Sequence, residues 1–286
     1  MSIHKISKVI TFLVGIMMMA IILDGCSSQV QLPQPQPAQD GDYYYSVTAR
    51  EAQITKYKGA GGAVTIPSTL AGFPVTSIGD GAFIDCTNLT NISIPQGVTS
   101  IGIAAFYGCK GLTTISIPQG VTSISKVAFY DCKGLTTISI PQGVTRIGDN
   151  AFSGCRDLAC ISIPQGVTRI GDNAFSGCKD LTSISIPQGA TSIGKEVFYG
   201  CDRLTTIKFN SVTTIIDDFS EIPCTTKIVG YAPSTAKTYA EKFNIKFEVI
   251  GPDTVLIWDL VELSKEKSTE MNVCPSDHPN VSMRNP

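Results

Sequence analysis

A repeat of 23 residues is the feature that most limits what this chain can fold into. Phenylalanine returns at this spacing six times without a gap, at Phe83, Phe106, Phe129, Phe152, Phe175 and Phe198. Three further series keep the same register: leucine from Leu89 to Leu204, isoleucine from Ile92 to Ile207, and isoleucine from Ile101 to Ile216. A period of this length is typical of solenoids, because one copy cannot bury its apolar residues and must stack on its neighbours.

The repeat unit, L-T-x-I-S-I-P-Q-G-V-T-x-I-G-x-x-A-F-x-x-C-x-x, divides into three parts. T-x-I-S-I alternates polar and apolar residues, which predicts a short strand, and the proline that follows ends it because proline lacks an amide donor. Gln-Gly then predicts a turn. The A-F-x-x-C stretch is too short for a full helix, so we expect a single helical or 3-10 turn on the far side of the coil.

The L-x-x-I-x-I-P pattern and the A-F-x-x-C turn resemble the BspA-like, Treponema-pallidum-type leucine-rich repeats of bacterial surface proteins. The resemblance extends over residues 43–249, and residues 54–83 are similar to the first repeat of that family. It implies a leucine-rich-repeat solenoid of the α/β repeat class, with short parallel strands on the concave face and short helical or 3-10 turns on the convex face. It also implies binding to host matrix proteins or to other bacteria rather than catalysis.

The composition along the chain predicts its domain boundaries. We expect a lipoprotein signal peptide at 1–25, a tether rich in proline and glutamine at 26–42, an N-terminal cap with the first repeat at 43–82, the repeat array at 83–226, a C-terminal cap at 227–250 and a largely disordered tail at 251–286. In the caps we expect a hairpin around Ala49-Arg50-Glu51, strands at 227–229 and 245–249, and a helix at 234–243 with Ser234 as its N-cap.

The first residues predict export from the cell. Lys5 and Lys8 precede an apolar run from Val9 to Leu23, whose helical length of about 22 Å is shorter than a bilayer core of about 30 Å. The following Leu23-Asp24-Gly25-Cys26 resembles a bacterial lipobox, which implies a lipid on Cys26 and a place on the cell surface or outer membrane. Asp24 departs from the small uncharged residue usual there. A secreted protein of a eukaryotic microbe, glycosylated at Asn88 and Asn91, is the alternative.

Polar residues alternate with the buried isoleucines on the predicted strands and are expected to face outward on the concave side. They are Asn91, Ser93, Thr114, Ser116, Thr137, Ser139, Cys160, Ser162, Ser183 and Ser185, followed by Thr206 and Lys208. One rim adds Gln96, Gln119, Gln142, Gln165 and Gln188. This nearly uncharged surface is the candidate ligand-binding face for a polypeptide or a glycan, although serine and threonine also suit any exposed strand. Docking of another envelope protein, in an assembly role, is a further alternative.

Six cysteines share one repeat position: Cys86, Cys109, Cys132, Cys155, Cys178 and Cys201. A column with one thiol per coil does not converge on one ion, as a zinc site requires, so we expect buried free thiols. Cys160 stands apart because it occupies an outward strand position. Two interpretations of Cys160 remain, a solvent-accessible thiol and simple drift at a tolerant position.

Charge and residue types exclude other functions. The net charge of −2 gives no basic surface for nucleic acid, and both histidines, His4 and His278, lie outside the repeats. The strand positions carry almost no carboxylates, so we expect no catalytic, metal or cofactor site. Two further ladders, Arg146 and Arg169 with an aspartate three residues after each, and the tyrosines Tyr107, Tyr130 and Tyr199, are expected on other faces of the coils. We expect a monomer that binds a protein or glycan ligand.

Overall fold

The computed structural model describes residues 38–217, 222–223 and 225–251. All of them belong to one compact unit, 37–286, and the account below concerns this unit alone. The predicted signal peptide, the lipobox with Cys26, the tether up to residue 37 and the tail beyond residue 251 lie outside the described residues.

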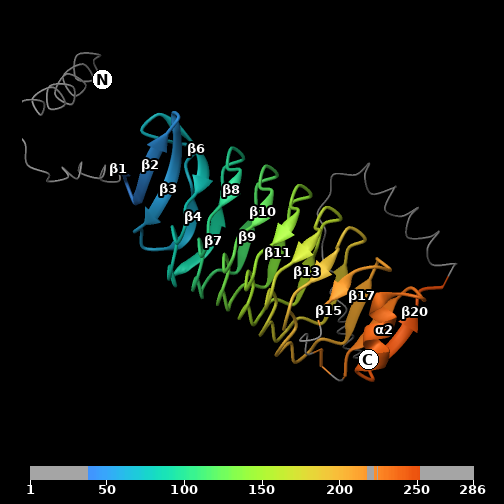
Figure 1. Cartoon of the computed structure of the whole chain (residues 1–286). Helices are drawn as coiled ribbons and strands as arrows, with labels where there is room; N and C mark the ends of the chain where they lie inside the picture. Colours follow the sequence, from blue (N-terminus) through green and yellow to red (C-terminus); the bar gives the residue numbers. More distant parts are fainter. Residues whose placement is uncertain (1–37, 218–221, 224, 252–286) are drawn as a thin grey trace, which may run out of the picture. The chain divides into compact units, whose positions relative to one another are not determined.

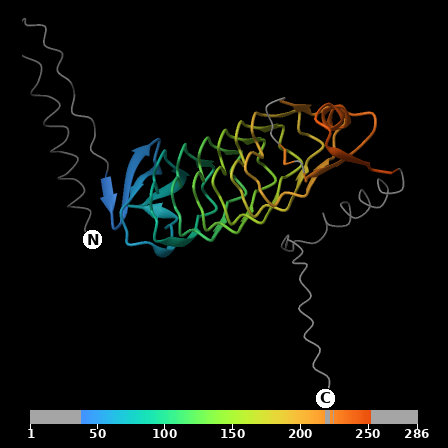
Figure 2. The same cartoon turned by 90° about the horizontal axis from the view of Figure 1, so that it is seen from below.

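The array is a stack of coils whose first strands form parallel sheets. Figure 1 shows β7, β9, β11 and β13 side by side, and Figure 2 shows the coils one behind another along the array. The first of these sheets has the order β13-β11-β9-β7-β4. Its strands are β4 (Gly62–Thr65), β7 (Leu89–Ser93), β9 (Thr114–Ser116), β11 (Thr137–Ser139) and β13 (Cys160–Ser162). The register is in step with the repeat, since Ile138 faces Ile115 on one side and Ile161 on the other.

The same face continues in a second parallel sheet of order β15-β17-β19-β20. Its strands are β15 (Ser183–Ile186), β17 (Thr206–Phe209), β19 (Lys227–Gly230) and β20 (Lys246–Val249). The strand ladder is therefore divided between β13 and β15. The sequence did not predict this division, because the repeat pattern continues through it.

Each coil also contains a second, two-residue strand, which the sequence analysis missed. These strands are β8 (Ser100–Ile101), β10 (Ser123–Ile124), β12 (Arg146–Ile147), β14 (Arg169–Ile170), β16 (Ser192–Ile193) and β18 (Ile215–Ile216). The last five form one parallel sheet, and β8 pairs with β6 (Phe73–Ile78). The isoleucines from Ile101 to Ile193 are buried, and the residue before each is half-buried or exposed. Two residues are too few for an alternation of polar and apolar side chains to reveal a strand.

The A-F-x-x-C stretch forms consecutive single turns closed by i→i+3 hydrogen bonds, in line with the predicted single turn, and no continuous helix. Alternate amides bond in different directions: Cys109 N–H donates to Phe106 O within the turn, whereas Phe106 N–H donates to Ala128 O in the next coil. A helix would use both amides within its own turn. The residue two before each phenylalanine, such as Ala104 and Asn150, takes positive φ, which also interrupts any helix.

The core is a set of stacked columns running through the coils. All six repeat phenylalanines are at most 1% exposed, and rings in successive coils stack with centroids 5.2 to 6.2 Å apart. Tyr57 extends the column into the N-terminal cap, with its ring 5.1 Å from that of Phe83. The prediction of a solenoid whose coils shield one another is confirmed.

The N-terminal cap is the predicted hairpin with an added edge strand. β2 (Tyr43–Thr48) and β3 (Glu51–Tyr57) pair antiparallel, and β3 continues the sheet to β6. β5 (Thr69–Leu70) pairs antiparallel with β6. β1 (Ala38–Asp40) pairs with β2, so these residues belong to the cap and not to the tether, which was expected to reach Asp42. Backbone pairing orders this segment although it buries no apolar side chain.

The C-terminal cap follows the prediction closely. Strand β19 leads into helix α2 (Thr235–Lys242), and β20 pairs parallel with β19. Ser234 is the N-cap, its Oγ accepting a hydrogen bond of 3.1 Å from the amide of Lys237. Ala236, Tyr239 and Ala240 form the buried face of the helix. Within the described part of the chain, no helix has the length and apolar character needed to span a membrane.

Candidate binding face

The predicted strand residues come together on one face, as expected. We use the name hydroxyl face for Asn91, Ser93, Thr114, Ser116, Thr137, Ser139, Ser162, Ser183 and Ser185, all of which are exposed. Parallel pairing aligns equivalent side chains from coil to coil, so Thr137 lies beside Thr114 and Ser139 beside Ser116. The face is thus a regular lattice of hydroxyl groups with an amide at its N-terminal end.

Few of these side chains bond to one another. Asn91 donates from Nδ2 to the hydroxyl oxygen of Thr114 at 2.9 Å, and Asn210 donates to the hydroxyl oxygen of Ser185 at 3.0 Å. In the exposed glutamine rim, the backbone N–H of Gln188 donates to the side-chain Oε1 of Gln165. The hydroxyl hydrogens of the face therefore remain able to donate to a bound molecule.

Cys160 is the exception on this face. It is half-buried and is bonded in a disulfide whose partner lies outside the described residues. The prediction of a solvent-accessible free thiol is therefore wrong. A repeat pattern shows which coil a residue occupies, but a disulfide depends on which distant segment comes within bonding distance. Cys160 also stands in β13, the strand at which the first sheet ends.

Two threonine columns, one before each strand ladder, have a different role. The hydroxyl of Thr113 donates to Thr90 O at 3.0 Å, and that of Thr136 donates to Thr113 O at 3.2 Å. In the other column, Thr168 donates to Thr145 O and Thr191 to Thr168 O. These hydroxyls tie neighbouring coils together, so we assign them to stability and not to binding. Their spacing of 23 residues was visible in the sequence, but the acceptors were not.

The cysteine column is confirmed as a set of free thiols. All are buried except Cys86, which is half-buried. In each of the four coils that contain Cys109 to Cys178, the cysteine Sγ donates to the carbonyl of the phenylalanine in the preceding coil, at 3.0 to 3.3 Å. Burial raises the pKa of Cys109 and of Cys201 to about 12 and that of Cys155 well above its usual value. These thiols stay protonated and act as small core residues at neutral pH.

The arginine and aspartate ladders expected from the sequence both form, and the aspartates bond the backbone of the next coil. Arg146 and Arg169 lie side by side in β12 and β14 and are exposed. Asp149 accepts a hydrogen bond from the amide of Asp172, and Asp172 accepts one from the amide of Lys195 in the following coil. The described residues include no cluster of three or more histidine, cysteine, aspartate or glutamate side chains that could hold a metal ion.

This architecture defines the class of the protein. Parallel strands in 23-residue register, stacked aromatic and aliphatic columns, and caps at both ends make a leucine-rich-repeat solenoid. A family model described as BspA type leucine rich repeat region matches in six copies, over residues 76–204 and 146–228. These matches cover more than half of the chain, which therefore belongs to the BspA-type leucine-rich repeat family. The resemblance inferred from the sequence is confirmed.

One solved structure supports this assignment, and a second is similar over a shorter part of the chain. The leucine-rich repeat protein of T. pallidum is 28% identical, with a TM-score of 0.57 over 74% of this chain and 98% of that chain. A leucine-rich repeat protein from Bacteroides capillosus is 30% identical over 44% of this chain and 96% of that chain, with a TM-score of 0.41. Comparison with curated protein sequences finds no significant match.

Proposed function

We propose that the chain is an exported, lipid-anchored surface protein that binds a host matrix protein or another cell through its hydroxyl face. The observation that carries the proposal is the lattice of exposed hydroxyl groups, aligned from coil to coil and without a carboxylate among them. Such a lattice suits an extended polypeptide, whose peptide groups repeat along its length and accept and donate hydrogen bonds in turn.

Affinity at such a face comes from many weak contacts. A single neutral hydrogen bond contributes only about 0.5–1.5 kcal/mol net. Nine exposed polar side chains spread over five coils allow several such bonds to form at once. The low charge of the face means that binding should depend little on ionic strength, because there are few ion pairs for salt to screen.

Introducing charge into the lattice tests the role of the face. In a variant with Ser116→Glu and Ser139→Glu, two carboxylates must lose water against the bound polypeptide, so binding to immobilised matrix proteins should fall at least tenfold, or about 1.4 kcal/mol. The matched control is Ser100→Glu with Ser123→Glu, because these serines are exposed in the second strand ladder. Circular dichroism checks that both variants fold. Equal loss in the two variants would place the binding site elsewhere.

The anchor is tested separately. The proposal rests on the lipobox resemblance at Cys26 and on membership of a family whose repeats occur in bacterial surface proteins. Metabolic labelling with a fatty acid should mark the wild-type chain, and Cys26→Ser should remove both the label and the association with membranes. A Cys26→Ser protein that remains with the membrane fraction would contradict lipid anchoring and leave the binding face untouched.

A further inference from the structure

One column on the flank of the coils changes its residue type midway along the array. After Ile84 in the first coil, the residue that follows each core phenylalanine is Tyr107, Tyr130, Ser153, Ser176 and Tyr199 in successive coils. Where two tyrosines are neighbours, at Tyr107 and Tyr130, their rings stack almost parallel with centroids 4.9 Å apart. The coil spacing thus allows one aromatic ring per coil in this column.

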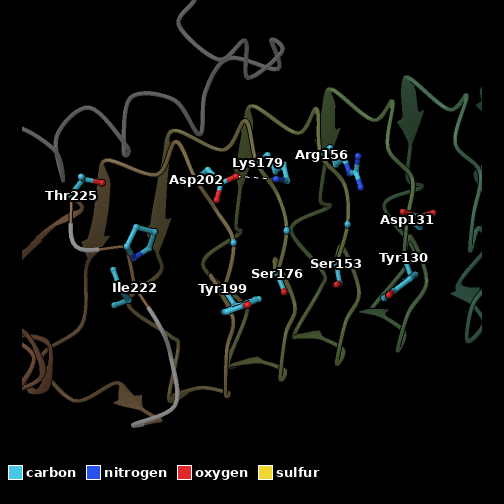
Figure 3. Close-up of a pocket in the computed structure, with 14 residues that line it drawn as sticks. Tyr130, Asp131, Ser153, Arg156, Ser176, Lys179, Tyr199, Asp202, Ile222 and Thr225 are labelled. Carbon is cyan, nitrogen blue, oxygen red and sulfur yellow. Dashed lines mark hydrogen bonds and ion pairs between the residues drawn. The ribbon is translucent and has the colours of Figure 1, made fainter.

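Two ring positions are left empty by the serines. Tyr130 and Tyr199 are three coils apart, with only Ser153 and Ser176 between them, and Figure 3 shows the four residues in one row. An open pocket of about 850 Å³ lies here, which we name the tyrosine trough, and Ile222, Pro223 and Thr225 also line it. One face of the Tyr130 ring is covered by Tyr107, so the other is turned towards the trough. Tyr199 is 53% exposed.

The floor of the tyrosine trough is backbone. Gly154, Gly177 and Gly200 line it, and all three have positive φ, between +68° and +78°. Residues with side chains rarely adopt this conformation, so the glycines keep the floor low along the trough. A bound molecule can therefore approach the main chain between the two tyrosines.

The rim of the trough carries balanced charge. Arg156 and Lys179 contribute two cations, and Asp131 and Asp202 contribute two carboxylates. Lys179 pairs with Asp202 at 3.0 Å, as Figure 3 shows, whereas Arg156 makes no ion pair within the described part of the chain. There is no net positive charge to attract a polyanion. The planar guanidinium and the carboxylates are instead suited to bonding neighbouring hydroxyl groups.

We propose that the tyrosine trough binds a short neutral oligosaccharide. The C–H faces of sugar rings pack on aromatic rings, and the side chains of Tyr130 and Tyr199 line the pocket on either side of the two empty positions. Sugar hydroxyls then meet Ser153, Ser176 and the charged rim. Neighbouring rings of the phenylalanine column beneath are 5.4 to 6.2 Å apart across these coils, so the trough has the length of a short chain of sugars.

This inference goes beyond the proposed function, because it uses another part of each coil. The hydroxyl face lies on the first strands, whereas the trough lies beside the turns that follow the core phenylalanines. The protein would thus contact a glycoprotein or a glycan-coated cell at two separate surfaces. Either site can fail experimentally without affecting the other.

Filling the empty ring positions is the sharpest test. Ser153→Tyr with Ser176→Tyr copies the stacking already present at Tyr107 and Tyr130, so this variant should fold and leave no space for a sugar. On a panel of neutral oligosaccharides of glucose, galactose, mannose and N-acetylglucosamine, the wild type should bind a subset, and the variant should bind none. The control, Ser93→Tyr with Ser116→Tyr on the hydroxyl face, should keep sugar binding.

Replacing a tyrosine that lines the trough gives an independent measurement of oligosaccharide binding. Tyr199→Ala should weaken binding of the selected oligosaccharide by at least about tenfold, equal to about 1.4 kcal/mol. Tyr107→Ala should change it by less than about twofold, because Tyr107 lies behind Tyr130 and outside the trough. The proposal is overturned if the wild type binds no neutral oligosaccharide, if it binds only sulfated or acidic ones, or if the filled variant binds as well as the wild type.

Discussion

The central coils and the C-terminal end of this solenoid bury different kinds of side chain. From Phe83 to Phe209 every buried side chain is apolar or a cysteine. The buried polar side chains of the described residues all lie in the C-terminal end, at Ser211, Thr214, Thr226 and Ser234. The phenylalanine rings also separate towards this end, from 5.4 Å in the middle to 6.2 Å between Phe175 and Phe198.

The difference follows from what each region has as a neighbour. A central coil meets an almost identical coil on both sides, so its columns continue and its backbone groups find equivalent partners. Near the end the two threonine columns continue at Thr214 and Thr226, but there the hydroxyls are buried. Thr214 donates to Ala190 O at 2.7 Å, and Thr226 donates to Leu204 O at 2.6 Å. Apolar columns stabilise the middle, where the bonded threonine hydroxyls are exposed, whereas buried threonine hydroxyls contribute at the end.

Phe129→Ala is the strongest test of the repetitive middle. Phe129 is fully buried and stacks on Phe106 and Phe152, so its removal should cost about 3–5 kcal/mol. Since coils couple mainly to their neighbours, the thermal transition should broaden or divide in calorimetry. The control is Ile215→Ala, at a side chain 66% exposed, which should change stability by less than about 0.5 kcal/mol. A single unchanged transition in Phe129→Ala would show that this column does not hold the coils.

Thr226→Val probes the individual bonds of the end. The buried hydroxyl of Thr226 is lost without a change of shape, and Leu204 O loses this partner, which should cost about 1–3 kcal/mol. Hydrogen exchange should quicken in β19, α2 and β20 and stay unchanged around Phe129. If exchange quickens equally in the central coils, the end and the middle unfold together, and the contrast between them does not extend to stability.

Alkaline pH should act on the middle through its thiols. Because burial holds the pKa of Cys155 well above 9.0 in the folded chain, the unfolded chain loses this proton first, and stability falls as pH rises above about 9. The loss grows as pH rises further, because the folded chain keeps this proton while the unfolded chain releases it. Cys155→Ala should remove that part of the pH dependence in urea unfolding. The half-buried Cys86 provides the comparison, and Cys86→Ala should remove less.

The smallest expected effect comes from repeating the threonine substitution in the middle. Thr136→Val deletes an exposed hydroxyl that donates to Thr113 O at 3.2 Å, and it should cost about 0.5 kcal/mol. Ala159 already occupies the same position in the following coil, so the array tolerates the missing hydroxyl. A loss from Thr136→Val as large as that from Thr226→Val would show that the middle also depends on individual polar bonds.

Much of the fold and of the candidate face could be predicted from the sequence. The register from Phe83 to Phe198 determined the core columns, and strand alternation placed residues such as Thr114 and Ser116 on the outer face. Ser234 and the helix that it caps were also recognisable. Each of these features depends on residues close together in the chain, or on one coil repeating the next, and both leave a periodic signal in a single sequence.

Other features were decided only by the tertiary structure. The second ladder through Ile124 and Ile147 and the open space between Tyr130 and Tyr199 depend on how adjacent coils meet. The disulfide at Cys160 depends on a segment distant from its coil. The sequence already placed Ser153 and Ser176 in the tyrosine column, but the ring spacing of 4.9 Å that makes two serines a trough exists only once coils are stacked. Periodicity specifies which residues recur, and contacts between coils specify the distances between them.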